Sequence, residues 1–555
     1  MRKDTSSHWR LAINTGLTAG GIAVLVSLVG FVATFSKSYI IQGVISIGEL
    51  ILFIPVVLLT YTSIRRFSTT SLQSQAGFSA LIGLVAGVLL SLLVMIGTAI
   101  NIREMFLNAS PALFELLTRG APLPLGLLVP PLQCILVAWI SLGIFRLSER
   151  YRKVVLQGIL WVVVLGTLRD QILLAYVLQQ EPIYTILKNI IFAQSGLSLL
   201  GTLVVFALTA SLSFYSSGRK RKKLNSQTPQ QQKYYRLAFF SGIALMMLLL
   251  PQMLGLFFTE ILDTTGLFIM MGLGLNIVIG FAGLLDLGYV AFYAIGAYTM
   301  GVLTSTGLGL FDLTFWQALP IALGVTWLAG ILLGLPVLRM RGDYLAIVTL
   351  GFGEIVRLLV LSDWLKATLG GTQGIQRIAQ PEVGQLSINT LQELYYLILI
   401  GIAVVAFIAW RLKDSRLGRS WMALREDEDV AEAMGINLVF TKLMAFSTGA
   451  LFAGLGGTIG AAKLTSVYPH SMTFIISINV LVLIIIGGMG SIPGVFVGAL
   501  VLVGLPGILT EFQEYRLWFY GLALVFVMLN RPEGLWPEAR RRRELHEETT
   551  ELVAE

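Results

Sequence analysis

Long apolar runs, separated by short charged or turn-forming segments, follow one another along almost the whole chain. Each run has about 20 residues, the length that a helix needs to cross a hydrocarbon core of about 30 Å. The first six runs lie at 14–34, 39–62, 78–100, 122–145, 154–178 and 187–214. Ten more lie at 237–258, 264–282, 287–305, 316–338, 344–361, 394–411, 440–461, 473–489, 493–510 and 515–530. The pattern predicts an all-α, polytopic membrane protein with about 16 transmembrane helices, arranged as about six followed by ten.

Composition supports this fold class. Of the 555 residues, 56% are hydrophobic and 13% are charged, whereas a soluble domain carries about 25% charged residues. There is too little charge to cover several globular surfaces, which excludes a soluble enzyme and a secreted scaffold. The net charge of +8 is concentrated in a few short loops, as orientation in a membrane requires, and therefore does not indicate a nucleic-acid binder.

The clustered basic residues of the short loops all fall on one side of the proposed membrane topology. They precede the first run, follow the second, fourth and sixth, and continue this alternation in the second half of the chain. They are Arg2, Lys3, Arg10, Arg65, Arg66, Arg146, Arg150, Arg152, Lys153, Arg219 to Lys223, Arg339, Arg341, Arg411, Lys413, Arg416, Arg419 and Arg540 to Arg543. Because short loops rich in Lys and Arg stay in the cytoplasm, we expect both termini to be cytoplasmic.

The same pattern divides the chain into four parts. Residues 1–215 form an N-terminal membrane module, and 216–236 (SSGRKRKKLNSQTPQQQKYYR) form a basic, glutamine-rich cytoplasmic linker. Residues 237–538 form a second membrane module, and 539–555 form a charged cytoplasmic tail. The linker's basic cluster could alternatively recruit anionic lipid.

The chain carries no recognisable catalytic, metal or phosphate-binding motif. Its one cysteine, Cys134, and its three histidines, His8, His470 and His546, are too far apart in sequence to show a zinc-ligand spacing. No GxxxxGK[ST] motif is present, so we expect no ATP site and no catalytic residue. Glycines spaced as small-xxx-small instead indicate close packing of membrane helices. They are Gly330 and Gly334, Gly456 and Gly460, and Gly490, Gly494 and Gly498.

Glycines also interrupt an apolar run at 272–298, where Asn276 and Asp286 place polar groups at or near membrane depth. Broken membrane helices expose backbone amides that can receive a substrate carboxylate. We therefore expect this region to line the substrate route, although Asp286 could equally mark a loop between two spans. The candidate residues are Asn276, Gly280, Gly283, Asp286, Tyr289, Tyr293 and Glu354.

Charged residues interrupt three other runs. Glu354 and Arg357 are three apart and can pair on one helical face, either for transport or as a structural ion pair. Arg169 and Asp170 interrupt the fifth run, and Glu49 lies in the second. Adjacent residues do not face each other on a helix, so the role of Arg169 and Asp170 stays open.

The most informative hydrophilic segment of the second module, 413–442, predicts a short exposed cytoplasmic helix. Ser420 is a candidate N-cap and Gly435 a candidate C-terminal stop. Trp421, Leu424, Ala431 and Met434, together with Ala423, would be available for contact with a soluble partner, the alternative being a solvated loop helix. The acids Glu426, Asp427, Glu428 and Asp429 spread around the helix and make a poor calcium site.

Five stretches in the second module together resemble the LivM-type permease subunit of branched-chain amino acid ABC importers. They are GLNIVIGFAGLLDLGYVAFYAIGAY, PVLRMRGDYLAIVTLGFGEIVRLL, GGTQGI, LGRSWMALREDEDVAEAMGI and GGMGSIPG. The resemblance covers residues 237–538 and leaves the six-helix extension, 1–215, without a recognised family.

The resemblance implies a multi-pass permease of the bacterial inner membrane that works by alternating access. Implied partners are a second homologous permease, two ATP-binding cassette subunits that use the ATP, a periplasmic substrate-binding protein, and an amino acid substrate. This chain would bind no cofactor itself. Residues 420–436 would form the ATPase-coupling helix, with Trp421, Leu424, Arg425, Glu426, Asp427, Glu428, Ala431, Met434 and Gly435 as its site residues.

Three alternatives remain at this stage. A sister branch of the family carries urea or related small amides. An ion-coupled secondary transporter could instead use Asp286, Glu354 and Arg357 without an ATPase. The N-terminal module could also be a sensor or assembly domain.

The topology generates the first testable prediction. Cysteines introduced at Ser217 and Thr549 should react with a membrane-impermeant thiol reagent only when the cytoplasmic face is accessible, because both positions flank basic cytoplasmic segments. Labelling of either position from the outside of intact cells would contradict the topology.

Overall fold

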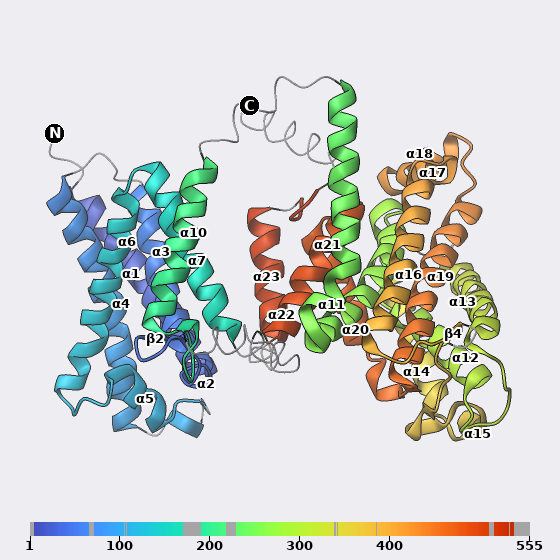
Figure 1. Ribbon diagram of the computed structural model, residues 1–555, viewed down its shortest axis with the longest axis horizontal. Coiled ribbons are helices and arrows are strands. Elements are labelled where there is room, and N and C mark those ends of the chain that lie inside the picture. The colour runs from blue at the N-terminus through green and yellow to red at the C-terminus, as the bar shows by residue number, and fades with distance from the viewer. Residues whose placement is uncertain are drawn as a thin grey trace. The chain divides into compact units, whose positions relative to one another are not determined.

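The structure is a computed structural model in which helices dominate (Figure 1). It describes residues 5–65, 71–100, 102–104, 106, 108–169, 172, 190–217, 229–337, 340, 342–383, 386–509, 516–531 and 533–537. Asp170, most of the predicted linker and the predicted tail lie outside these residues. The chain forms two compact units, Met1–Phe240 and Ser241–Glu555, each described below by itself.

The N-terminal unit is built from long helices joined by short ones at the loops. The helices are α1 (Thr5–Val29), α2 (Phe31–Thr34), α3 (Ile47–Arg65), α4 (Leu72–Ala99), α5 (Pro111–Thr118), α6 (Val129–Arg146), α7 (Glu149–Thr167) and α10 (Leu199–Ser217), with 3-10 turns at Ile102–Glu104 and Leu125–Leu128. Two short strands, β1 (Tyr39–Ile41) and β2 (Ile45–Ser46), pair antiparallel.

Helix α4 lies at the centre of this unit, packed against α1 and α6. The contact with α6 is close because α4 carries glycine there: a Cβ at Gly87 would lie 2.3 Å from Pro131 Cα. Ala86 and Leu90 of α4 and Cys134 and Ala138 of α6 are buried in the core of the unit. Small residues thus let the backbones approach, which stabilises membrane helix pairs through van der Waals packing.

Two predicted spans of this unit start later than the apolar pattern indicates. Residues 39–46 form the β1–β2 hairpin around Gly43, whose φ is +72°, so the helix of the second span begins only at Ile47. The sixth span, expected from 187, begins at Leu199, because Leu197 pairs with Ile41 in an isolated parallel bridge. Apolar β-branched residues suit either a helix or a strand, so hydropathy alone cannot place these boundaries.

The second unit contains the following elements. The helices are α11 (Pro229–Leu275), α12 (Val290–Thr304), α13 (Phe315–Val337), α14 (Asp343–Leu361), α15 (Lys366–Leu369), α16 (Leu391–Lys413), α17 (Arg416–Glu426), α18 (Glu428–Ala433), α19 (Leu438–Leu464), α20 (Phe474–Gly487), α21 (Ile492–Ala499), α22 (Leu505–Ile508) and α23 (Arg516–Asn530). π-Helical segments occupy Asn276–Phe281 (η4) and Leu500–Gly504, and 3-10 turns occupy Asp363–Leu365, Gly371–Gln373 and Pro469–Ser471. Short antiparallel strand pairs join β3 (Ile375–Gln376) to β6 (Ser466–Val467) and β4 (Glu382–Val383) to β5 (Leu386–Ser387).

Helix α11 contains two predicted spans. Gly255 separates them with φ +76° and ψ 177°, a conformation that only glycine adopts readily. The part after Gly255 is buried inside the unit, and α19 packs against both α12 and α13. The core of this unit therefore lies around α11, α12 and α19.

The glycine spacing correctly predicted most of the close helix contacts in this unit. A Cβ at Gly330 on α13 would lie 2.7 Å from Ala450 Cβ on α19, and one at Gly498 would lie 2.1 Å from Leu483 O. For Gly490 the packing interpretation is wrong. This residue lies in the turn between α20 and α21 with φ +81°, so it serves the turn rather than a helix face.

The fold class is confirmed: each predicted span overlaps at least one helix. Ten helices of the described residues are long and apolar enough to cross a membrane, and four shorter apolar helices, of 10–17 residues, accompany them. The chain is thus an all-α, multi-pass membrane protein.

Helix packing at Gly330 gives a stability prediction with a control on the same helix. Gly330→Leu should destabilise the second unit by about 1–3 kcal/mol, because the new side chain overlaps Ala450 and Ser447 on α19. Gly324→Leu should cost little, since no atom lies within 4 Å of a Cβ there. Thermal unfolding of the two purified variants measures the difference, and equal melting temperatures would contradict the packing.

Candidate functional site

The hydrophilic loop of the second unit folds as two helices, α17 and α18, rather than the one helix predicted from Ser420. Ser415 caps α17 by accepting a hydrogen bond from Gly418 N at 3.1 Å, and Ser420 lies inside that helix. Asp427 interrupts the pair with φ −157° and caps α18 by accepting from Asp429 N and Val430 N. Aspartate is a strong N-cap, so the acidic run itself starts a second helix.

Most of the loop's apolar side chains face the protein's own bundle. Trp421, Leu424 and Ala431 are buried, and Trp421 Nε1 donates a hydrogen bond to Thr441 O at 2.9 Å. The prediction that these three present an exposed docking surface is therefore wrong. An amphipathic helix buries its apolar face against whatever lies nearest, and here the nearest surface is the start of α19.

The exposed face of the loop is different from the predicted one. Met434 is 79% exposed and Val430 is 58% exposed. Glu426, Asp427, Asp429 and Glu432 are also exposed around them. Gly435 follows α18 with φ +85°, and Ile436 N donates to Ala431 O, as in a glycine-terminated helix end.

An ion pair anchors the loop to α19. Glu428 pairs with Lys442, whose side chain is only 1% exposed. A buried ammonium without a partner would be costly, so Glu428 is held toward the bundle while its neighbours in the acidic run point to solvent.

Arg425 joins the loop to the interrupted apolar segment. Its guanidinium donates to the carbonyl oxygen of Gly280 at 2.6 Å. Its aliphatic part lies against Gly283, where a Cβ would be 2.8 Å from Arg425 Cγ. Gly283 has φ +72°, so both the conformation and the close contact require glycine there.

The interruption between α11 and α12 is present in the structure. Helix α11 passes into the π-helical segment η4, the chain then turns through 282–289, and α12 begins at Val290. π-Helical turns within helices frequently mark functional sites, since they disturb the regular backbone ladder.

The polar residues of this segment are buried and bonded to the protein. Asn276 Oδ1 accepts from Gly490 N at 2.8 Å, and Tyr289 Oη donates to Gly449 O at 2.7 Å. Asp286 Oδ1 accepts from Gly288 N at 2.9 Å. In this conformation Asn276, Tyr289 and Asp286 hold the broken segment in place.

Gly280 and Tyr293 also have packing contacts. A Cβ at Gly280 would lie 2.2 Å from Asn276 Oδ1, which leaves room only for glycine. Tyr293 Oη lies where a Cβ on Gly460 would approach within 2.3 Å, so α12 packs closely on α19 there. Gly280 thus lies beside Asn276, whereas Tyr293 lies at the contact between α12 and α19.

Glu354 borders a cavity of about 280 Å³. The cavity is lined by Leu287, Gly288, Val290, Leu350, Gly353, Glu354, Met472 and Phe474. The predicted pairing is confirmed, because Arg357 Nε donates to both carboxylate oxygens of Glu354 at 3.0 and 3.1 Å. The cavity lies beside the turn at Gly288, so an ion pair and the broken segment border the same space.

Sequence reasoning missed several polar contacts. Ser477 Oγ accepts from Val290 N at the start of α12. Lys463 Nζ donates to Glu260 Oε1 at 2.8 Å, while neighbouring Asp263 is fully buried with no hydrogen-bond partner among the described residues. Glu260, Asp263 and Lys463 lie just outside the predicted apolar runs and Ser477 is uncharged, so the run pattern gave no signal for these contacts.

In the N-terminal unit, the structure gives a contact to Arg169. Its Nε donates to Ala193 O at 2.9 Å, which holds the segment before α10. Among the described residues, no group of His, Cys, Asp and Glu could hold a metal ion.

Known proteins resemble the second unit in sequence. Residues 257–528 match the family described as branched-chain amino acid transport system / permease component. The chain is 41% identical over 304 residues to the high-affinity branched-chain amino acid transport system permease protein LivM of Salmonella typhimurium, covering 51% of this chain and 70% of that protein. It is 42% identical to the LivM of Escherichia coli over the same shares of each chain.

A second kind of relative matches more distantly. The permease protein LivH of Escherichia coli is 26% identical over 293 residues, covering 48% of this chain and 90% of LivH. No solved structure matches the chain. With 41% identity across more than two thirds of LivM, this chain belongs to the family of branched-chain amino acid transport permease components.

Proposed function

We propose that the chain is a membrane-spanning permease subunit of an ATP-binding cassette importer in the bacterial inner membrane. Its substrates would be branched-chain or other neutral amino acids delivered by a periplasmic binding protein. The similarity of the second unit to LivM is the observation that carries this proposal.

The proposal includes a second, homologous permease subunit. The chain matches LivM strongly and LivH weakly, and both are named as permease proteins of the branched-chain amino acid system. A pair of related permeases would enclose one route between them, with the Glu354 cavity as a candidate part of this chain's contribution.

ATP would be used by separate ATPase subunits, because the sequence has no phosphate-binding loop. The loop that carries α17 and α18 is the candidate docking element. Its exposed side combines Val430 and Met434 with the acids Glu426, Asp429 and Glu432. Apolar residues surrounded by charge are typical of a small protein interface.

The contact through Arg425 suggests how movement of the loop would reach the membrane helices. Trp421 and Leu424 fix α17 to the bundle, and Arg425 connects it to Gly280. A shift of the loop would therefore displace η4, and with it the start of α12 beside the Glu354 cavity. Discrete rearrangement of packed helices is a general means of alternating access.

Docking through the exposed face can be tested with charge substitutions. Val430→Asp and Met434→Asp should reduce co-purification of the ATPase subunits encoded beside this chain by about tenfold, because each places a carboxylate in an apolar contact. The matched control is Val44→Asp, since Val44 is 52% exposed and belongs to the N-terminal unit. Wild-type association of both loop variants would move the docking surface elsewhere.

Coupling through Arg425 requires a separate test. Arg425→Ala should leave ATPase association unchanged but lower substrate-stimulated ATP hydrolysis and uptake by about tenfold, because the charged hydrogen bond to Gly280 is lost. Arg419→Ala serves as the control, since Arg419 is on the same helix and donates only to nearby Asp414 O. Normal uptake by Arg425→Ala would show that the loop communicates by another contact.

A further inference from the structure

A cavity of about 150 Å³ lies inside the N-terminal unit, where the loop before α3 meets the end of α5. Under the predicted topology this is the non-cytoplasmic end of the unit. Its lining includes Val32, Leu52, Phe53 and Leu117 on the apolar side, and Glu49 and Arg119 on the polar side.

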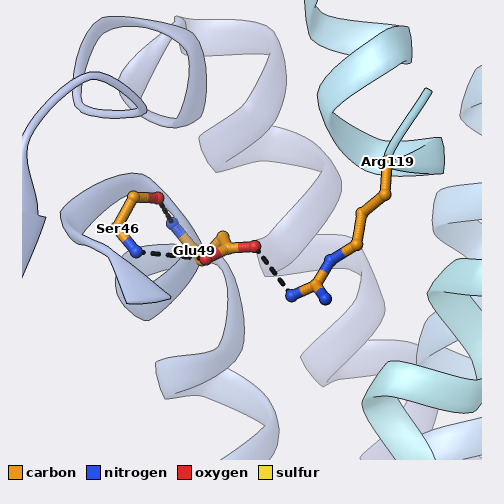
Figure 2. A network of polar contacts seen from close by, with 3 residues as sticks. All are labelled: Ser46, Glu49 and Arg119. Atoms are coloured by element: carbon orange, nitrogen blue, oxygen red, sulfur yellow. Dashed lines mark hydrogen bonds and ion pairs between the residues drawn. The ribbon is translucent and has the colours of Figure 1, made fainter. Parts of the chain in front are cut away.

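Both carboxylate oxygens of Glu49 accept hydrogen bonds within the protein (Figure 2). Its Oε2 accepts from Ser46 N at 3.1 Å, and its own N–H donates to Ser46 Oγ at 3.1 Å. This reciprocal arrangement is a capping box at the start of α3. Glu49 Oε1 accepts from Arg119 Nη2 at 3.0 Å.

Arg119, by contrast, has N–H donors that bond to none of the described residues. A guanidinium carries five N–H donors, and one of them bonds to Glu49 within the described residues. The side chain is 58% exposed. Arginine can hold a second carboxylate on another edge of its planar group, because the donors form a rigid fork.

The backbone at Arg119 adds an independent observation. Arg119 ends α5 with φ 51° and ψ 37°, in the left-handed region that is unfavourable for residues other than glycine, asparagine and aspartate. The next residue, Gly120, has φ +70°. This left-handed turn ends α5, and the Arg119 side chain beyond it lies beside Glu49 at the cavity.

The cavity's size and lining restrict the ligand. A space of about 150 Å³ holds a molecule the size of benzene. Val32, Leu52, Phe53 and Leu117 provide a buried apolar part of its lining. The site therefore suits an anionic group on Arg119 joined to a short hydrocarbon chain.

We propose that this cavity binds a small carboxylate with a short apolar chain, whose carboxylate is held by Arg119 and whose chain lies against the apolar wall. A simple carboxylic acid and an amphiphilic α-amino acid share this chemistry. The site is separate from the proposed transport function and does not depend on it, since all its residues belong to the N-terminal unit.

Calorimetric titration of the full-length protein with isovalerate tests the site, with isopentylamine as the probe of equal shape and opposite charge. Isovalerate should bind and isopentylamine should not. Arg119→Gln should weaken isovalerate binding by about tenfold or more, whereas Arg103→Gln, an exposed arginine outside the lining, should have little effect.

Glu49→Gln separates a binding role from a structural one. Glutamine preserves the capping box but removes the carboxylate that competes for Arg119, so isovalerate should bind several-fold more tightly. Absence of isovalerate binding, equal binding of the amine, or weakening by Glu49→Gln comparable to that by Arg119→Gln would overturn the proposal.

Titration with leucine tests whether the ligand is a simple carboxylic acid or an α-amino acid. If leucine binds the wild-type protein but not the Arg119→Gln variant, the ligand is an amino acid and isovalerate is its deaminated analogue. Binding of isovalerate without such leucine binding would assign a simple carboxylic acid. Leucine binding that is insensitive to Arg119→Gln belongs to the second unit and does not count as support.

Discussion

The hydrogen bond from Arg425 to the Gly280 carbonyl connects the loop that carries α17 and α18 to the break between α11 and α12. A backbone carbonyl released from the regular helical ladder needs another donor when it is kept from water. Arg425 supplies that donor from α17, and Gly283 leaves space for its side chain. The loop and the break in the membrane helix are thereby held to each other.

This connection depends on a rigid environment. Trp421 is fixed by burial and by its bond to Thr441, and Glu428 is paired with buried Lys442. Glycines allow α12 and α13 to pack closely on α19, which carries Thr441 and Lys442. A force on the loop would therefore act on packed helices rather than on a loose connection, as a mechanism with discrete conformations requires.

The sequence predicted the spans, the break near Gly280 and the position of the loop, because apolar run length and glycine interruptions are local properties. The sequence does not predict which of two possible surfaces an apolar helix face will contact. The apolar face of α17 could meet either a partner or its own bundle, and periodicity does not distinguish them, so Trp421 was assigned to the wrong side. The β1–β2 hairpin was missed for a related reason: its residues are as apolar as those of a span. Arg119 was not noticed, because its pairing with Glu49 joins positions 70 residues apart.

We propose that the energy for transport comes from ATP hydrolysed by subunits other than this chain. Uptake of radiolabelled leucine into proteoliposomes tests it most directly, comparing this chain alone with the complex that includes its partner permease, ATPase subunits and binding protein. Leucine should accumulate only in liposomes that contain the complete complex and ATP. An ion gradient across liposomes that contain this chain alone should drive no leucine accumulation. Accumulation by the isolated chain under an ion gradient would contradict it and would support an ion-coupled transporter instead.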